Sequence, residues 1–412
     1  MNVIIVTIGD EILLGQVLDT NAWCIARHLA RAGMEVVEML SIVDRGERIA
    51  AVLDDVLARA GVVIITGGLG PTNDDVTKRA LADYFHAPLV LRADVLAWIE
   101  ELLDRRGQAL NENNRGQACL PEGCRVLFNP KGTAPGMWFE RGEKVVIALP
   151  GVPFEMEHLM EHEVMPALRA RYPGATLAYR VVKVYHVAES DLAHRLAAWE
   201  GCLPGEVGLA YLPSPGLVKL RVTARGEKGL EALDACFAGL LEELAGLRFT
   251  VGEEPGLGEE VLRRLRGKSL AVAESCTGGS IAREITRVPG ASDCFAGGVV
   301  AYSNEVKATL LGVSWEVLAR HGAVSEPVVV QMAEGVRRLL KTDYAVATSG
   351  IAGPGGAVPG KPVGTTWIAV ATPRGTAARL FHFSFTRERN IARAVMKALE
   401  MVIEAAGDAP PY

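Results

Sequence analysis

The chain alternates apolar segments of strand length with segments of helical periodicity, and this order constrains the fold more than any other feature. In the first part, the strand-like segments NVIIVTIG, EVVEMLSIV and VVIITGG are separated by the helix-like segments NAWCIARHLARAG and ERIAAVLDDVLARA. A helix that joins two strands returns most easily to a parallel neighbour, so the order predicts a parallel sheet with crossover helices. The same alternation recurs from residue 257 onward, which predicts a second α/β sheet.

The length and hydrophobic content predict more than one buried core. The chain has 412 residues, of which 49% are hydrophobic, and a single core rarely organises so many. Pro173 and Gly174 close the first α/β region, and a small α+β region with the order β-α-β-β-α-β follows. The segment Glu253-Glu254-Pro255-Gly256 has the composition of a linker. We therefore predict three domains, at residues 1–173, 174–252 and 253–412.

Charge and cysteine usage argue against several classes of protein. The net charge is −6, and no cluster of lysine and arginine stands apart from acidic neighbours, which argues against a nucleic-acid partner. The seven cysteines include no CxxC pair, as expected for buried thiols in a reducing compartment. The first residues resemble a strand rather than a signal peptide, and no apolar run is long enough to cross a bilayer. We expect a cytoplasmic protein without a membrane partner.

A glycine-rich turn follows the apolar segment VVII and precedes a helix-like segment. Gly67, Gly68 and Gly70 lie in this turn, and Asp74 and Asp75 come directly after it. Such glycines let backbone N–H groups surround an anion, and paired carboxylates beside a phosphate require a divalent cation between them. The pattern therefore suggests metal-assisted chemistry on a phosphate or pyrophosphate. The alternative is a tight turn followed by a helix that the aspartates cap.

The segment AESCTGG, residues 273–279, joins the apolar run SLAVA to the helix-like segment SIAREITRV. A turn of this kind presents its side chains at the carboxyl edge of a sheet, and the first N–H groups of the helix are available to stabilise an oxyanion. Ser275 or Cys276 would then be the nucleophile, and we expect Cys276 to pack as a small buried side chain. The only histidines of this region, His321 and His382, give weak support for a histidine base.

Lys307 is the better candidate for the base. In GGVVAYSNEVKATLLG a strand ends at Tyr302, and Asn304 is placed to cap a helix that has Lys307 in its first turn. A lysine at a helix N-terminus faces an unfavourable dipole, and partial burial as well lets it lose its proton near neutral pH. Serine–lysine pairs are a known variant of the catalytic triad. The alternative is a capping hydroxyl beside a solvated lysine.

One further motif has the spacing of a metal site. His158, Glu161 and His162 fit the HxxEH pattern of inverted zinc peptidases, which places two imidazoles on one helix face. A pattern with three fixed positions arises easily in a helix as rich in Glu and His as FEMEHLMEHEV. We therefore favour a solvated helix face over a peptidase.

Ordered motifs along the chain resemble those of the CinA family, the competence/damage-inducible proteins. In the first region they are GDEILLGQVLDTN, TGGLGPTNDDVT, NPKGTAPGMW and LPGVPFEME, and in the last AESCTGG, ITRVPGAS, VVAYSNEVK, GAVSEPVV, SGIAGP and KPVGTTWIA. The resemblance implies a parallel-sheet domain similar to the molybdopterin-binding proteins MoaB and MogA, a small KH-like α+β domain and a C-terminal α/β amidase domain. The middle region lacks a GxxG loop with basic flanks, so we expect a packing role there.

For the N-terminal domain, the resemblance implies metal-dependent hydrolysis of ADP-ribose to AMP and ribose 5-phosphate. The three glycines of the turn would bind the anion, and Asp74 with Asp75 would hold a divalent cation of the Mg, Mn or Co type, with potassium as a further cation. Glu11 and Asn21 would line the same pocket, because their motif leaves the carboxyl end of the first strand.

For the C-terminal domain, the stand-alone relatives are the PncC nicotinamide-nucleotide amidases. The implied reaction converts nicotinamide mononucleotide into nicotinic acid mononucleotide and ammonia without a cofactor. Ser275 would attack the carboxamide carbon, Lys307 would take and return its proton, and Tyr302 would hold or polarise the pair. Backbone N–H groups near Thr277 and Gly278 would receive the oxyanion.

A second glycine-rich turn, SGIAGP, would bind the ribose or phosphate of the nucleotide. The residues that we expect to contact the substrate in this domain are Gly279, Ser349, Gly350 and Gly353. The family also leads us to expect a homodimer. Two other functions stay open: a non-catalytic protein that binds a nucleotide or pterin and regulates competence or DNA repair, and a molybdopterin adenylyltransferase, which the fused amidase-like domain disfavours.

Overall fold

The computed structural model describes residues 2–72, 75–174, 176–214, 216–253 and 256–407. It divides into two compact units. The N-terminal unit comprises residues 1–179, 202–208 and 222–238, and the C-terminal unit comprises residues 180–201, 209–221 and 239–412. Within the described ranges, no helix is long and apolar enough to cross a membrane.

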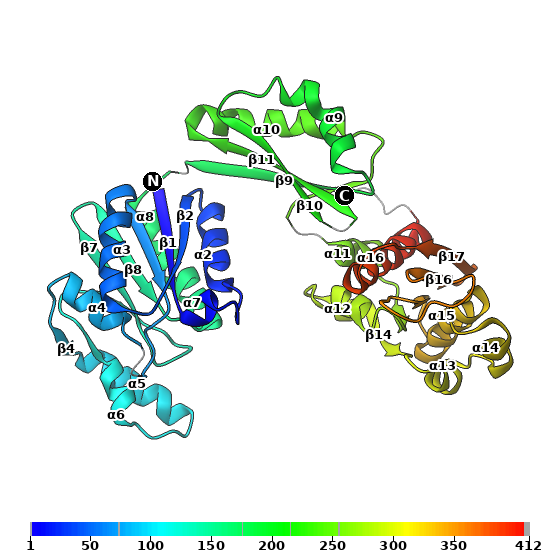
Figure 1. The fold of residues 1–412 in the computed structure, drawn as a ribbon, viewed down its shortest axis with the longest axis horizontal. Coiled ribbons are helices and arrows are strands. Elements are labelled where there is room, and N and C mark those ends of the chain that lie inside the picture. Colours follow the sequence, from blue (N-terminus) through cyan, green and yellow to red (C-terminus); the bar gives the residue numbers. More distant parts are fainter. Residues whose placement is uncertain (1, 73–74, 175, 215, 254–255, 408–412) are drawn as a thin grey trace. The chain divides into compact units, whose positions relative to one another are not determined.

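The N-terminal unit is built on a six-stranded sheet of order β2-β1-β3-β8-β7-β6 (Figure 1). The four strands β2, β1, β3 and β8 run parallel, and β7 and β6 are antiparallel to their neighbours. The predicted parallel sheet with crossover helices is therefore confirmed. The strands of the sheet are β1 (Asn2–Ile8), β2 (Glu35–Ile42), β3 (Val62–Thr66), β6 (Arg125–Leu127), β7 (Gly136–Arg141) and β8 (Lys144–Leu149).

Helices cover both faces of this sheet because successive residues of its inner strands are apolar and point to opposite sides. On one side Ile4 and Val6 of β1 pack with α3, and on the other Val3 and Ile5 pack with α2 and α7. The remaining elements are α1 (Asp10–Leu13), α2 (Thr20–Arg31), α3 (Gly46–Arg59), α4 (Thr77–Tyr84), β4 (Leu89–Leu91), α5 (Ala93–Arg105), α6 (Glu112–Gln117), β5 (Cys119–Pro121), α7 (Pro153–Leu159), a π-helical turn (Met160–Val164) and α8 (Met165–Arg171).

The region between the two α/β sheets has the predicted element order β-α-β-β-α-β. Its strands form a four-stranded sheet of order β10-β11-β9-β12. The elements are β9 (Leu177–Tyr185), α9 (Glu189–Glu200), β10 (Val207–Ser214), β11 (Leu217–Arg225), α10 (Gly226–Glu243) and β12 (Phe249–Val251).

The last sheet has five strands in the order β14-β13-β15-β16-β17, with parallel pairing only among β14, β13 and β15. Its strands are β13 (Leu270–Glu274), β14 (Phe295–Val300), β15 (Tyr344–Gly350), β16 (Thr365–Thr372) and β17 (Gly375–His382). One face packs against α11 and α16, and the other against α13 and α15. The helices are α11 (Leu257–Arg264), α12 (Ser280–Thr286), α13 (Asn304–Leu311), α14 (Trp315–His321), α15 (Glu326–Leu340) and α16 (Arg387–Ala406), with a 3₁₀ turn at Ala291–Asp293.

Candidate functional site

Three parallel strands of the C-terminal sheet end at one edge, and polar residues lie at each end. Ser275 follows β13, Tyr302 follows β14, and Ser349 lies near the end of β15. β13 pairs in parallel with β14 on one side and with β15 on the other. Because the carboxyl ends of neighbouring parallel strands meet, residues far apart in sequence come together at this edge.

Lys307 and Ser275 are in contact. Lys307 Nζ lies 3.2 Å from Ser275 Oγ, 2.7 Å from the carbonyl oxygen of Ala301 and 3.3 Å from that of Tyr302. A neutral amine has two N–H groups and one lone pair, so the two carbonyls can accept both N–H groups while the lone pair faces the serine hydroxyl. A general base needs this arrangement.

The environment of Lys307 favours its neutral form. The side chain is 1% exposed, so the alternative of a solvated lysine is wrong. Burial lowers the pKa of Lys307 below its ordinary value of 10.5, and a smaller interaction with Cys276 opposes the shift. Because burial disfavours the ammonium form, this amine loses its proton at a lower pH than an exposed lysine does.

The helix that carries Lys307 is capped by Ser303, and our prediction of Asn304 as its cap is wrong. Ser303 has an extended backbone, and its hydroxyl accepts the N–H of Val306 at 3.2 Å. Asn304 is instead the first residue of α13. Serine and asparagine are both strong N-cap residues, so sequence alone could not distinguish the two neighbouring positions.

Glu274 contradicts another expectation, namely that the first N–H groups of the helix after AESCTGG are available to a substrate. This carboxylate is fully buried and accepts the N–H of Gly279 at 3.0 Å, of Ile281 at 3.0 Å and of Ala282 at 2.8 Å. A buried anion at a helix N-terminus satisfies donors that would otherwise lack partners. The N–H groups at the start of α12 therefore hold the turn in place.

The turn at residues 275–279 has fewer free N–H groups for an oxyanion than we predicted. The Gly278 N–H donates to the carbonyl of Ser275 at 3.2 Å, which removes Gly278 as a free oxyanion donor. The Thr277 hydroxyl lies 2.8 Å from that of Thr348, in the strand beside it. Within the described residues, no backbone or side-chain hydrogen bond uses the Thr277 N–H, so this group remains the candidate donor.

We predict that Glu274→Ala destabilises the protein by about 3 kcal/mol, because three buried N–H groups lose a charged acceptor. Glu274→Gln retains one acceptor oxygen and should give a smaller loss. The free energy of unfolding from urea titrations would measure both effects. Equal stability of the Ala variant and the unaltered protein would contradict this role of Glu274.

The phenol of Tyr302 points away from the Ser275–Lys307 pair. Tyr302 is 63% exposed, and its hydroxyl accepts a hydrogen bond from Arg387 at 3.2 Å. Its contact with Lys307 is made through its backbone carbonyl. Arg387 also donates to the carbonyl of Gly353 at 2.7 Å, and so links the ends of two strands. Sequence reasoning missed Arg387 because it follows no recognised motif.

The second glycine-rich turn lies beside the first. Gly350 is packed so closely that an added Cβ would lie 3.1 Å from Cys276 Sγ. The Ser349 hydroxyl donates to the carbonyl of Ala323 at 2.7 Å, which fixes the turn rather than leaving this hydroxyl free. Asn390, another residue that sequence reasoning missed, donates to the carbonyl of Ala352 at 3.1 Å.

Other residues at this edge are less suited to catalysis. Cys276 is buried as predicted, and burial raises the pKa of its thiol to about 12, which keeps the thiol protonated near neutral pH. His321 is the last residue of α14, and its carbonyl accepts a hydrogen bond from Lys361. His382 Nδ1 lies 3.5 Å from the hydroxyl of Thr365. These contacts leave Lys307 as the base in contact with Ser275.

A second candidate site lies at the end of β3 in the N-terminal unit. Gly67 and Gly68 have φ angles of 110° and 64°, which side-chain-bearing residues rarely adopt. An added Cβ at Gly67 would meet the carbonyl oxygen of Ile8, and one at Gly68 would meet the hydroxyl of Thr77. The turn therefore lies close against the end of β1 and the start of α4.

Asn21 connects the strand ends around this turn. Its Nδ2 donates to Thr66 Oγ1 at 3.0 Å and to the carbonyl of Gly151 at 2.8 Å. Among the described residues, its buried Oδ1 has no hydrogen-bond partner, and neither has the buried hydroxyl of Thr77 beside Gly68. Buried polar atoms without partners are rare, so these two oxygens make the turn a candidate ligand site.

Among the predicted metal ligands, Asp74 lies outside the described residues. Asp75 Oδ2 accepts hydrogen bonds from the N–H and the hydroxyl of Thr72, at 2.9 Å and 2.5 Å. A Cβ added to Gly70 would collide with the Asp75 carboxylate, so this carboxylate lies directly beside the glycine-rich turn. The Glu11 carboxylate folds back over Gly9 at the end of β1. Both Thr72 hydrogen bonds use Asp75 Oδ2, and no hydrogen bond to a described residue uses its Oδ1.

The HxxEH motif does not form a convergent metal site. The rings of His158 and His162 stack with centroids 4.2 Å apart, and His162 Nδ1 lies 3.0 Å from the carbonyl oxygen of His158. His162 is exposed and His158 is half-buried, and both belong to one helical surface. The geometry agrees with the solvated face that we favoured.

Two protein families match the chain. Residues 4–170 match the family described as a probable molybdopterin binding domain, and residues 256–406 match the CinA C-terminal domain. A CinA-like protein of Flavobacterium psychrophilum is 43% identical over 98% of this chain and 98% of its own length. A CinA-like protein of Gemmatimonas aurantiaca is 46% identical over 90% of this chain and 88% of its own length.

Solved structures match single parts of the chain. The competence damage-inducible protein A from Klebsiella pneumoniae is 40% identical and covers 36% of this chain and 93% of its own, with a TM-score of 0.35. The molybdopterin biosynthesis enzyme MoaB from Thermus thermophilus is 23% identical and covers 41% of this chain and 95% of its own, with a TM-score of 0.28.

Proposed function

The chain belongs to the CinA family, and from this premise we propose that its CinA C-terminal domain is a serine–lysine amidase that deamidates nicotinamide mononucleotide. The observation that carries the proposal is the contact between a buried lysine and the Ser275 hydroxyl, at 3.2 Å. A buried amine without its proton activates a serine hydroxyl in the same way as the histidine of a triad. The products are nicotinic acid mononucleotide and ammonia.

In the proposed reaction, Ser275 Oγ attacks the carboxamide carbon while Lys307 Nζ accepts the hydroxyl proton. The carbonyl oxygen becomes an oxyanion, which the Thr277 N–H would receive. Lys307 then gives the proton to the leaving nitrogen, ammonia departs, and an ester on Ser275 remains. Water hydrolyses the ester with Lys307 again as the base, which restores the serine hydroxyl and releases the acid.

Substrate binding would use the turns around this pair. The guanidinium of Arg387 lies between Tyr302 and Gly353, at the ends of two parallel strands. A planar guanidinium is well suited to a nucleotide phosphate. We therefore assign the phosphate to this side of the pair, together with the turn that contains Ser349, Gly350 and Gly353.

For the N-terminal domain we propose metal-dependent hydrolysis of ADP-ribose. The support is the glycine turn at Gly67 and Gly68, the carboxylate of Asp75 beside Gly70, and two buried oxygens, of Asn21 and Thr77, that have no partner among the residues the structure describes. Asp75, together with Asp74, would hold the divalent cation, which neutralises pyrophosphate charge and activates water. Potassium would be a second cation of this site.

We predict that Asp75→Asn lowers ADP-ribose hydrolysis by ~10²-fold or more, since charge stabilisation by a bound cation is worth several kcal/mol. An asparagine retains an oxygen for the Thr72 hydrogen bonds, so the turn should persist. Asp74→Ala should silence the same reaction. Phosphate release from AMP or ribose 5-phosphate in a phosphatase-coupled assay would measure the rates.

The two reactions should be separable. Ser275→Ala should silence deamidation and leave ADP-ribose hydrolysis intact, while the aspartate variants do the reverse. Loss of both reactions in either variant would contradict independent sites. If no variant of the N-terminal site changes a hydrolytic rate but Asp75→Asn weakens nucleotide binding, the alternative function, a nucleotide- or pterin-binding regulatory domain, is the better account.

A further inference from the structure

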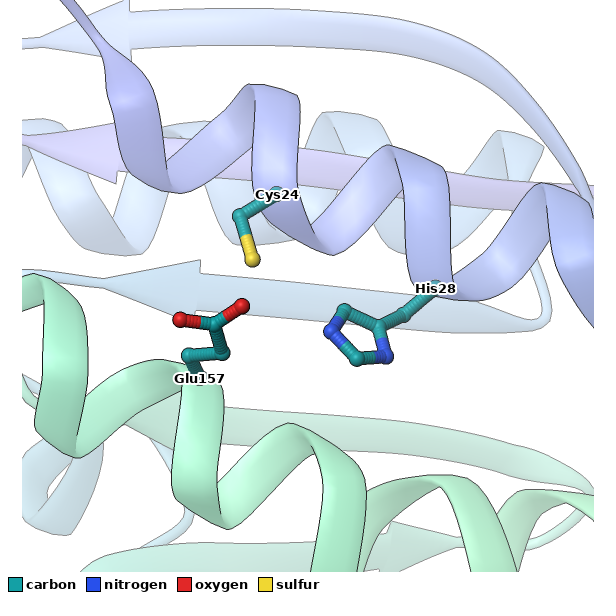
Figure 2. A group of neighbouring side chains, drawn as sticks. All are labelled: Cys24, His28 and Glu157. Carbon is teal, nitrogen blue, oxygen red and sulfur yellow. The ribbon is translucent and has the colours of Figure 1, made fainter. Parts of the chain in front are cut away.

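A group of three potential metal ligands lies between α2 and α7, apart from both sites described above. Cys24 and His28 belong to α2, and Glu157 belongs to α7 (Figure 2). One ligand atom from each side chain lies within 4.8 Å of the other two. Figure 2 shows all three side chains pointing into the space between the two helices.

The helical spacing explains this convergence. Cys24 and His28 are four residues apart, which places them on one face of α2, and this face packs against α7. Cys24 and His28 are half-buried, and Glu157 is at the surface side of the group. Glu161, four residues after Glu157, acts electrostatically on His28 and so lies close to the same face.

Charged groups of both signs surround these three side chains. The imidazole, the thiol and the carboxylate each bring one ligand atom to the same place, and Glu157 and Glu161 act electrostatically on His28 against the guanidinium groups of Arg27 and Arg31. A divalent cation would replace the thiol proton and neutralise the carboxylate, as in other thiolate-containing metal sites.

We propose that Cys24, His28 and Glu157 bind Zn²⁺. Zinc is favoured because it accepts a thiolate, an imidazole and a carboxylate together, whereas Mg²⁺ and Ca²⁺ select oxygen ligands. Three side chains leave a fourth tetrahedral position, which Glu161 or a water molecule fills. The site is independent of the activities proposed above.

The position of this zinc site gives it a structural role. Cys24 lies one turn after Asn21 on α2, and α7 begins two residues after Gly151, the residue whose carbonyl accepts the Asn21 amide. A cation that joins α2 to α7 would hold this amide against the turn of Gly67. Bound zinc should therefore stabilise the domain without taking part in hydrolysis.

Cobalt(II) provides the direct test, because thiolate coordination gives it a charge-transfer band in the near ultraviolet. Metal-free full-length protein titrated with Co²⁺ should show this band, and one equivalent of Zn²⁺ should remove it. Cys24→Ser should abolish the band. His28→Gln and Glu157→Gln should each weaken Zn²⁺ binding by about 100-fold or more, because loss of a direct ligand should cost at least as much as loss of a residue that only supports a ligand, which costs about 10- to 100-fold.

Matched controls separate this site from its neighbours. Cys276→Ser and His158→Gln should retain the cobalt band, and so should Asp75→Asn. Zn²⁺ should also protect Cys24 from iodoacetamide, as measured by peptide mass, in the unaltered protein and not in His28→Gln. A band that persists in Cys24→Ser, or equal alkylation of Cys24 with and without Zn²⁺, would overturn the proposal.

Discussion

Ser275→Ala is expected to lower the rate of ammonia release from nicotinamide mononucleotide by ~10⁴-fold or more, the loss seen when a hydrolase loses its nucleophile. The substitution removes only the hydroxyl group of a residue that is 9% exposed, so the neighbouring residues need not move. Ammonia release can be followed with a glutamate dehydrogenase-coupled assay at saturating substrate. The thermal midpoint of unfolding should stay close to that of the unaltered protein.

Cys276→Ser is the matched control for this experiment. Its thiol adjoins the nucleophile, but burial raises the pKa of Cys276 to about 12 and keeps it protonated. We expect Cys276→Ser to retain deamidation within about tenfold of the unaltered rate, since the contact between Ser275 and Lys307 is kept. A complete loss in Cys276→Ser with near-normal activity in Ser275→Ala would reverse the assignment of the nucleophile.

Lys307→Met is expected to lower deamidation by ~10³- to 10⁴-fold, because the hydroxyl of Ser275 loses its base while the unbranched side chain still fills the buried space. The carbonyls of Ala301 and Tyr302 lose their donor, so a modest decrease in stability accompanies the change. Lys307→Arg should not rescue activity, since a guanidinium keeps its proton and cannot act as the base. Recovery of activity in Lys307→Arg would show that only positive charge is required.

The pH dependence follows from the lowered pKa of Lys307. The amine is active when neutral, so kcat/KM should rise with pH through the lowered pKa and level off above it. Stability should change in the same direction. Between the folded pKa and 10.5 the unfolded chain binds more protons at this lysine, so the free energy of unfolding rises with pH. A rate that falls with pH across this window would contradict a neutral lysine.

The pattern of apolar residues was sufficient to predict the sheets, and the resemblance to the CinA family was needed to choose the pairing of Ser275 with Lys307 over a capping hydroxyl and a solvated lysine. Apolar segments alternate with helical ones, and parallel strands joined by helices must end at one edge, which brings together residues separated by 32 positions. The β-α-β-β-α-β order of the middle region follows from the same periodicity. In each case the pattern of apolar residues dictates the element, and the element dictates the position of the polar residue after it.

Side-chain contacts between elements that are distant in sequence could not be predicted. The Glu274 carboxylate reaches across the turn and accepts the N–H groups at the start of α12, so a substrate cannot use them. The known spacing rules for helix caps do not include this contact. Arg387 reaches Tyr302 and Gly353 from the last helix, 85 residues after the tyrosine. Likewise, only the packing of α2 on α7 brings Glu157 to Cys24 and His28.

The central claim is that a neutral, buried Lys307 makes Ser275 the group that becomes acylated. Acid quenching during the first turnover of nicotinamide mononucleotide, followed by peptide mass analysis, tests this claim directly. We predict an acyl group on the peptide that contains Ser275, with its mass equal to that of the substrate less ammonia, and much less of it in Lys307→Met. An acyl group on Cys276, or ammonia release with no acylated peptide at any time, would contradict the account.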